Sequence, residues 1–188
     1  MVLCGTMPDP GRDIVYFDLE TQRSAGDVGG FGKRDRMKMS VVVTFSTRIG
    51  EYRIFREHEA GDLAQQLMQA GLVVGFNHVG FDYGVLQPYT LFTLIDHTVN
   101  LDLLVDLEQR LGRRVSLEAV AKPTLGAGKT HEGTQAIRWW REGKVREIAE
   151  YCAYDVKVTR RVHEFGVRHG FVRYLDSSGR DQEVRVSW

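Results

Sequence analysis

Short runs of β-branched and aromatic residues alternate along the chain with polar turns and predict the strands of a sheet. The first run, DIVYFDL, follows the turn-forming Pro10 and Gly11. The second and third runs are joined across residues 47–50, which favours an antiparallel hairpin. The strands predicted in this way cover residues 13–19, 39–46, 51–56 and 72–76, with a shorter one near 98–101.

Apolar residues three and four positions apart predict helices in the rest of the chain. In residues 59–70 this spacing brings Leu63, Leu67 and Ala70 to one face, and Gly71 supplies a stop signal. A further helix begins at Ser116, a good N-cap residue. The other predicted helices cover residues 80–89, 101–111, 133–141 and 144–169, and residues 171–188 predict a β-hairpin that turns at 176–179.

A glycine-rich basic segment, residues 21–38, separates the first two strands. Its glycines break any helical or strand period, so the sequence predicts a mobile loop. Lys33 and Arg34 begin a cationic group that continues to Lys38. Because the loop leaves the end of the first strand, we expect it to close over a site there and to contact phosphate. The alternative is a solvated charged face, and the basic groups near residues 110–114 and 138–146 leave the same choice open.

This order of strands and helices, without an internal repeat or linker, predicts one α/β domain over residues 1–188, with helices on both faces of a mixed sheet. The 188 residues are 43% hydrophobic and 27% charged, which allows a core without metal or disulfide staples and excludes a disordered or fibrous chain. The 25 basic and 25 acidic residues give a net charge of zero, so any nucleic-acid contact must be local. Two distant cysteines, short apolar runs and no leader-like N-terminal pattern predict a cytoplasmic protein without a membrane span.

Two carboxylates end the first predicted strand. Asp18 and Glu20 are two positions apart, so both project from one face of the strand while Leu19 points the other way. A pair of this kind can hold a cation or act in catalysis. By itself it is weak evidence, because a solvated strand end often carries the same residues.

A polar turn, NHVGFD, follows the strand at residues 72–76. It places Asn77, His78 and Asp82 in the crevice beyond the strand ends, where ligands of open α/β sheets bind. Asp82 would begin a helix near the carboxylates of the first strand, and Asn77 and His78 are candidate substrate contacts. The alternatives are a capped turn, a capped helix and a surface histidine.

The long helix at residues 144–169 carries Tyr151 and Asp155 one turn apart. Four residues of about 1.5 Å rise put them on one face, roughly 6 Å apart, so a phenol and a carboxylate can serve one site. Aspartate has a poor propensity inside a helix, which calls for a reason. A salt bridge with Lys157 or Arg160 is the plain alternative.

Taken together, D-x-E, N-x-x-x-F-D and Y-x-x-x-D in this order resemble the DEDD family of 3′ to 5′ exonucleases, in its tyrosine-containing DEDDy subgroup. The resemblance extends from Asp13 to about Gly166. In the runs TLGAGK and EYCAYDV the chain looks closest to exonuclease domains found alone or fused to helicase-like regions in bacteria and archaea. It implies a ribonuclease H-like fold, a five-stranded mixed sheet with the carboxylates at one rim, and a helicase as one possible partner.

The resemblance also implies two Mg²⁺ or Mn²⁺ ions. A phosphodiester and an attacking hydroxide are both anions, and hard cations held by carboxylate oxygens can contact the entering and the leaving oxygen. In this reading Asp18 bridges the ions, Glu20 and Asp155 hold the ion with the nucleophilic water, and Asp82 holds the other. Tyr151 would orient the water.

Lys129 lies in GAGKT, which looks like the end of a phosphate loop. The leading glycine of that motif would fall on Pro123, and a predicted helix instead of a strand precedes it, so an ATP site is disfavoured. We expect Lys129 to reach a substrate phosphate or to lie in a plain loop. Trp139 and Trp140 point about 100° apart on a helix, so at least one of them belongs to the core and not to a base-stacking surface.

The sequence therefore predicts a metal-dependent 3′ to 5′ exonuclease that acts on single-stranded DNA or RNA ends and releases nucleoside 5′-monophosphates. Direction and product come from the resemblance alone. One alternative is an endonuclease of the same fold with a groove for duplex. The other is a non-catalytic nucleic-acid-binding or helicase-associated module, in which the motif residues would be expected to have decayed. Sugar preference and oligomeric state stay open.

Overall fold

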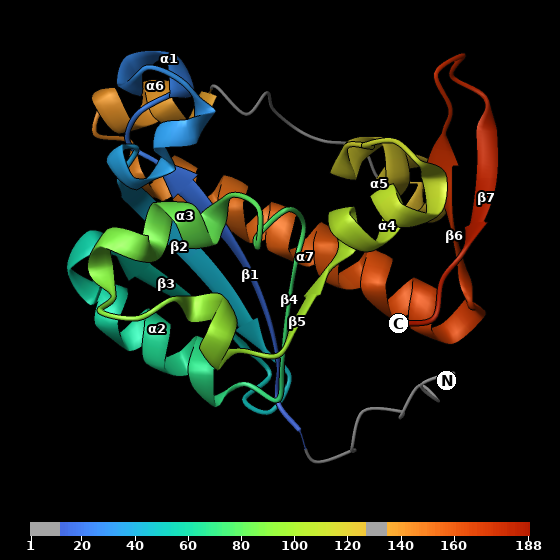
Figure 1. Cartoon of the computed structure of the whole chain (residues 1–188), viewed down its shortest axis with the longest axis horizontal. Coiled ribbons are helices and arrows are strands. Elements are labelled where there is room, and N and C mark those ends of the chain that lie inside the picture. Colours follow the sequence, from blue (N-terminus) through green and yellow to red (C-terminus); the bar gives the residue numbers. More distant parts are fainter. Residues whose placement is uncertain (1–11, 127–134) are drawn as a thin grey trace.

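A five-stranded mixed sheet forms the centre of the molecule (Figure 1). The computed structural model describes residues 12–126 and 135–188. The strand order is β3-β2-β1-β4-β5, in which β1 pairs antiparallel with β2 and parallel with β4. The predicted α/β class and mixed sheet are thus confirmed. The strands are β1 (Ile14–Thr21), β2 (Met39–Ser46), β3 (Glu51–Arg56), β4 (Leu72–Gly75) and β5 (Asn100–Asp102).

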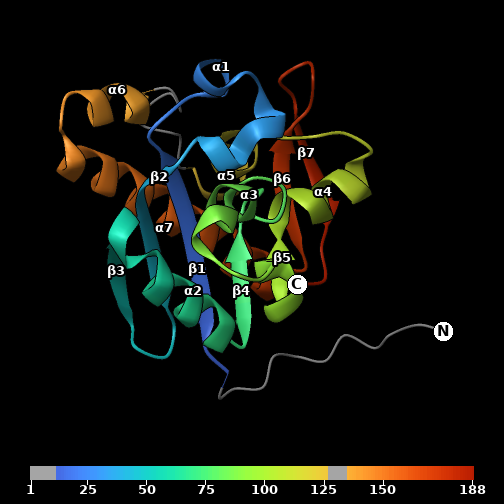
Figure 2. The same cartoon turned by 60° about the vertical axis from the view of Figure 1, so that its left-hand side comes forward.

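Helices cover both faces of this sheet (Figures 1 and 2). On one face, α2 and α3 pack over Val15 and Phe17 in one apolar cluster. On the other face, α7, α4 and α5 enclose a second cluster around Tyr16 and Val43. The helices are α1 (Ala25–Val28), α2 (Ala60–Gln69), α3 (Asp82–Leu86), α4 (Leu103–Leu111), α5 (Leu117–Leu125), α6 (Gln135–Arg141) and α7 (Val145–His169); 3-10 turns span Phe31–Arg36, Glu57–Glu59, Gln87–Tyr89 and Leu94–His97.

The alternation of side chains along β1 decides where its carboxylates lie. Val15, Phe17 and Leu19 belong to the cluster under α2, whereas Tyr16 belongs to the cluster under α7. Because side chains of a strand alternate between faces, Asp18 and Glu20 continue the row of Tyr16. The apolar pattern of the strand therefore presents both carboxylates to the face that α7 covers.

Residues 21–38 differ from the predicted irregular loop, because they contain α1 and the 3-10 turn Phe31–Arg36. Ser24 and Asp27 form a capping box, in which each side chain accepts a hydrogen bond from the backbone N–H of the other. Gly29 then ends the helix with a φ of 88°. This local capping signal outweighs the many glycines, which suggested a segment without regular structure.

The segment between β4 and α5 is also less helical than its sequence suggests. The predicted helix at 80–89 is only α3 followed by a 3-10 turn, and the predicted helix at 101–111 begins two residues later because β5 takes residues 100–102. Asp102 caps α4 by accepting hydrogen bonds from the backbone N–H groups of Leu104 and Val105. The predicted N-cap of α5 is confirmed, since the Ser116 side chain accepts from the N–H of Ala119.

The predicted C-terminal hairpin is confirmed as β6 (Phe171–Leu175) and β7 (Asp181–Arg185), a two-stranded sheet of its own. It packs on α5 and α7 (Figure 1). Beyond β7, Trp188 lies directly over Gly166 of α7 and donates its indole N–H to Asp106 of α4 at 2.8 Å. No helix of the described residues has both the length and the apolar character that crossing a bilayer requires.

Candidate active site

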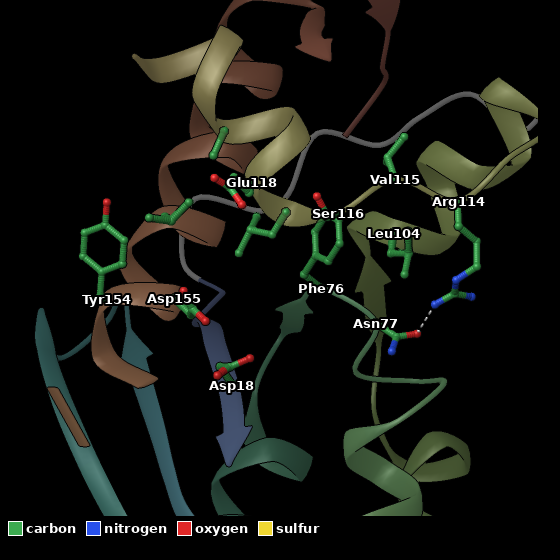
Figure 3. Close-up of a pocket in the computed structure, with 13 residues that line it drawn as sticks. Asp18, Phe76, Asn77, Leu104, Arg114, Val115, Ser116, Glu118, Tyr154 and Asp155 are labelled. Carbon is green, nitrogen blue, oxygen red and sulfur yellow. Dashed lines mark hydrogen bonds between the residues drawn. The ribbon is translucent and has the colours of Figure 1, made fainter. Parts of the chain in front are cut away.

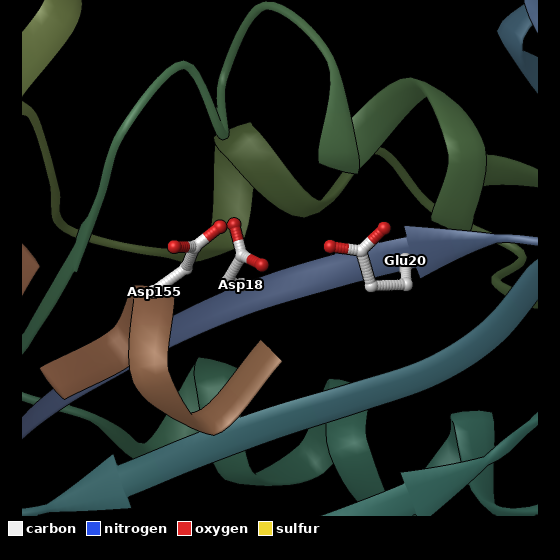
Figure 4. Close-up of side chains that lie close together, drawn as sticks. All are labelled: Asp18, Glu20 and Asp155. Carbon is white, nitrogen blue, oxygen red and sulfur yellow. The ribbon is translucent and has the colours of Figure 1, made fainter. Parts of the chain in front are cut away.

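Three carboxylates from two elements converge at the end of β1. One oxygen from each of Asp18, Glu20 and Asp155 lies within 4.8 Å of the others (Figure 4). Asp155 comes from α7, which crosses the face that Asp18 and Glu20 occupy. Carboxylates this close repel one another unless a cation neutralises them, and a set of oxygen donors suits a hard divalent ion. The donor set therefore fits Mg²⁺ or Mn²⁺.

Asp82 is the first residue of α3 and is buried, with 5% of its surface exposed. Among the described residues, Asp82 is not part of the cluster of Asp18, Glu20 and Asp155. It is close enough to Asp18 for the two carboxyl groups to interact electrostatically. Burial, followed by the charge of Asp18, raises the pKa of the Asp82 carboxyl well above its ordinary value. The fourth predicted carboxyl group, that of Asp82, thus lies beside the cluster. Without a cation, its surroundings favour the protonated form.

Tyr151 lies one helical turn before Asp155 on α7, as the spacing predicts, and is 4% exposed. Burial is the largest cause that raises the pKa of its phenol, and the negative charges of Asp155 and Glu20 add to it. The hydroxyl consequently stays protonated at neutral pH. It can donate a hydrogen bond in this acidic surrounding.

Cys152, the next residue of α7, packs directly behind Asp18. Its Sγ is 3.1 Å from the Asp18 carbonyl oxygen and 3.5 Å from Oδ2 of the same residue. Burial and the charge of Asp18 raise the pKa of the thiol well above its ordinary value, so it remains a neutral S–H donor. In the sequence Cys152 is only one of two distant cysteines, and its place beside Asp18 depends on the tertiary fold.

Asn77 and His78 occupy the turn after β4, and their side chains have different surroundings. Asn77 has a left-handed φ of 72°, and its Oδ1 accepts a hydrogen bond from Arg114 at 2.9 Å. His78 is 1% exposed, and its ring packs against Phe17 with the Nε2 3.2 Å from Asn100 Oδ1. Burial lowers the pKa of His78, so the ring stays neutral inside the core. The ring of His78 thus lies in the core and lacks the exposure that the predicted substrate contact requires.

The carboxylate of Asp102 holds this turn by hydrogen bonds. Its carboxylate accepts hydrogen bonds from the backbone N–H groups of Asn77 at 2.7 Å and Val79 at 3.0 Å, in addition to those of α4. Asp102 is not part of any motif predicted from the sequence. An aspartate directly before an apolar helical run was the available signal, because it is a typical N-cap.

A pocket of about 580 Å³ opens beside the carboxylates (Figure 3). Its walls combine apolar side chains with a few polar groups, among them Asn77 and Arg114 on one side and Glu118 on another. A concave apolar surface with a few polar groups is the usual form of a small-ligand site. The lining residues are Asp18, Phe76, Asn77, Leu104, Arg114, Val115, Ser116, Leu117, Glu118, Ala121, Tyr154, Asp155 and Val158.

The predicted cationic contacts lie apart from this pocket. Lys33 is exposed on the 3-10 turn after α1, whereas the side chain of Arg34 packs along Gly84 of α3 and is only partly exposed. Lys129 lies outside the described residues. The ring of Trp139 on α6 meets that of Tyr151 edge-on, with centroids 6.3 Å apart. Trp139 therefore packs against the phenol.

Comparison with known proteins agrees with this arrangement. The RNase H superfamily matches residues 15–165. The chain belongs to the RNase H superfamily. This is a superfamily of nucleases, and RNase H-like nucleases use divalent metals, which fits the carboxylate cluster at the end of β1.

Solved structures share the RNase H-like fold. Among them is the family B DNA polymerase of the hyperthermophilic archaeon Pyrobaculum calidifontis, with a TM-score of 0.63 and 16% sequence identity. The similarity covers 84% of this chain and 25% of the polymerase chain, so this chain corresponds to about a quarter of the polymerase. No curated protein gave a significant match.

Proposed function

We propose that this chain is a divalent metal-dependent 3′ to 5′ exonuclease of the DEDDy type, working as one domain. It hydrolyses phosphodiester bonds at single-stranded DNA or RNA ends and releases nucleoside 5′-monophosphates. The observation that carries the proposal is the convergence of Asp18, Glu20 and Asp155 within 4.8 Å, with Asp82 beside them, in a member of a nuclease superfamily.

The four carboxylates would hold two metal ions. Asp18 lies next to both Asp155 and Asp82, so it is the candidate bridging ligand. Glu20 and Asp155 would complete one site, and Asp82 the other. When bound, the ions would neutralise the phosphate and lower the pKa of an attacking water.

Tyr151 would position the attacking water. Its phenol is neutral, buried and one helical turn from Asp155 on α7, so the O–H lies beside the carboxylates. A fixed donor reduces the orientations open to a water at this place. The phenol does not need to ionise in this role.

The substrate would enter beside the carboxylates. The pocket next to Asp18 and Asp155 has room and apolar surface for one nucleoside, and Asn77 lines it with its amide oxygen fixed by Arg114. Lys33 and Arg34 would contact phosphates from the segment after β1. We retain Lys129 as a further candidate phosphate contact.

Hydrolysis assays with matched variants test the proposal. Single-stranded DNA and RNA of one sequence are incubated with EDTA, Mg²⁺ or Mn²⁺ and with wild-type protein, Asp18→Ala or Glu51→Ala, the last an exposed carboxylate on β3. We expect metal-dependent cleavage by wild type and Glu51→Ala and none by Asp18→Ala. Equal cleavage by Asp18→Ala would remove the site assignment.

Two further substrates separate the alternatives. A circular single strand has no 3′ end, so an exonuclease leaves it intact and an endonuclease opens it. A non-catalytic module would bind the linear strand without cleaving it in any metal. Either of these results would replace the exonuclease proposal.

A further inference from the structure

Phe31 is an exposed aromatic residue that packs against the residue before α3. It begins the 3-10 turn after Gly30 and exposes 66% of its surface. Its ring meets that of Phe81 edge-on, with centroids 6.4 Å apart, and Phe81 directly precedes Asp82. Single exposed apolar side chains are common on proteins. This one stands out because its ring contacts Phe81, the residue directly before the fourth predicted carboxylate.

The turn that begins with Phe31 also carries three cationic residues. Lys33, Arg34 and Arg36 lie on the same turn, and none of them forms a salt bridge with a carboxylate in residues 12–126 or 135–188. By contrast, the neighbouring Lys38 is 3.7 Å from Glu57. The acidic residue of the turn is Asp35. Lys33 and Arg36, which are both exposed, are therefore available to an anion that approaches the exposed ring.

The ring and the pocket lie on different parts of the molecule. The pocket beside Asp18 and Asp155 is lined from β1, α4, α5, α7 and the segments beside them, and no residue of 21–38 contributes to it. Phe31 instead contacts the residue before α3. One nucleotide in the pocket would therefore leave Phe31 free for another part of the same strand.

Resting on the proposed function, we propose that Phe31 stacks on an unpaired base upstream, on the 5′ side, of the scissile phosphate, while Lys33 contacts a neighbouring phosphate. An exposed aromatic face beside unpaired cations is suited to single-stranded nucleic acid, because every base has a face that can stack and every nucleotide carries a phosphate. A paired base in a duplex does not offer its face, so the contact selects single strands.

Two substrates test this role. Thymidine 5′-(p-nitrophenyl phosphate) carries one nucleoside and no upstream base, whereas the oligonucleotide dT10 carries both. We expect Phe31→Ala to lower kcat/KM for dT10 about tenfold, corresponding to about 1.4 kcal/mol, which lies within the range for one stacked base. The same variant should hydrolyse the nitrophenyl ester within twofold of wild type.

Three controls make the result specific. Phe31→Trp keeps a stacking face and should restore kcat/KM for dT10. Tyr52→Ala removes a different exposed aromatic residue, 42% exposed on β3, and should change neither substrate. Thermal melting of Phe31→Ala should match wild type, because the ring is mostly exposed.

The outcomes distinguish this inference from the proposed function. If Phe31→Ala treats dT10 and the ester like wild type, the stacking role is wrong and the exonuclease stands. If wild type hydrolyses neither substrate, the exonuclease proposal fails, and fluorescence anisotropy with labelled dT10 then decides the role of Phe31. Equal affinity of wild type and Phe31→Ala for dT10 would overturn it.

Discussion

Asp18 lies between a neutral thiol and two other carboxylates. The neutral thiol of Cys152 contacts both its carbonyl and its carboxylate, while Glu20 and Asp155 crowd it with like charge. Such crowding opposes folding in the absence of a cation and strengthens the binding of one. In the proposed metal site, this repulsion would make the metal-free protein less stable and the binding of a cation stronger.

Removing the charge of Asp155 should relieve the repulsion in the metal-free protein and weaken the binding of a cation. We expect Asp155→Asn to melt in EDTA at the same temperature as wild type or a few degrees higher, since about 1 kcal/mol corresponds to about 2–4 °C at this chain length. Mn²⁺ should raise the melting temperature of wild type and not that of the variant. Calorimetry checks both, and an undiminished Mn²⁺ shift in Asp155→Asn would contradict the ligand assignment.

The phenol of Tyr151 should affect rate without affecting metal binding. Tyr151→Phe keeps the ring that Trp139 contacts and removes only the hydroxyl. We expect kcat to fall about 100- to 1,000-fold, as for loss of one positioned polar group, with the Mn²⁺ concentration for half-maximal rate within twofold of wild type. Steady-state kinetics over a Mn²⁺ series measures both quantities. A large shift in metal requirement with kcat unchanged would count against the water-orienting role.

At the scale of elements, α7 connects the site to the C-terminal hairpin. Tyr151 and Asp155 lie on its first half, and Gly166 near its end receives Trp188. A Cβ at Gly166 would lie 2.4 Å from the Trp188 ring, closer than any real contact allows. The glycine is thus required by the close approach of the indole, although glycine inside a helix is otherwise unfavourable.

Gly166→Ala should destabilise the fold. Displacing the indole costs about 1–3 kcal/mol by overpacking, which exceeds the gain of about 1 kcal/mol in helix propensity. The matched control is Gly61→Ala in α2, where a Cβ meets nothing within 4 Å and stability should stay equal or rise. Urea denaturation of both variants measures the difference. A more stable Gly166→Ala would show that Trp188 does not pack as described.

The sequence predicted elements well where one local signal dominated. Continuous apolar runs identified β1, β2 and β4, and Ser116 identified the start of α5, because burial and capping act locally. It failed at α1, where a four-residue helix depends on a capping box inside a glycine-rich stretch. It also failed for the burial of His78, because only the packing of β4 against Phe17 and Asn100 brings that ring inside.

The same distinction applies to the site. Strand alternation and helical spacing correctly paired Asp18 with Glu20 on one face and Tyr151 with Asp155 on one turn. They could not bring the two pairs together, because the contact between Asp18 and Cys152 spans 134 positions. Arg114 and Asp102 were missed as partners of Asn77 for the same reason: their contacts exist only once α4 and β4 are packed.

At the scale of the whole molecule, His163 joins the first strand to the last residue. It is 4% exposed, its Nδ1 and the Tyr16 hydroxyl form a hydrogen bond at 2.8 Å, and Trp188 lies over its ring with centroids 5.9 Å apart. Burial lowers the pKa of His163 to about 4, against an opposing effect of Glu164. Folding therefore favours the neutral ring.

This burial gives stability a pH dependence. Since the folded pKa is below the unfolded value of about 6.5, the contribution of the neutral ring is complete above pH 6.5 and is lost as the pH falls toward 4. The full loss is of the order of 3 kcal/mol. His163→Gln should flatten this part of the curve in urea denaturation between pH 7 and 4. An unchanged slope would assign the acid sensitivity to other groups.

The most direct test of the central claim, that this fold brings its carboxylates together to shorten a strand from the 3′ end, is a time course on one 5′-labelled single-stranded 20-mer with Mn²⁺. The claim predicts a ladder that shortens by one nucleotide at a time, with nucleoside 5′-monophosphate as the released product and no ladder from Asp155→Asn. Immediate release of a short labelled fragment, or products unaffected by Asp155→Asn, would contradict it.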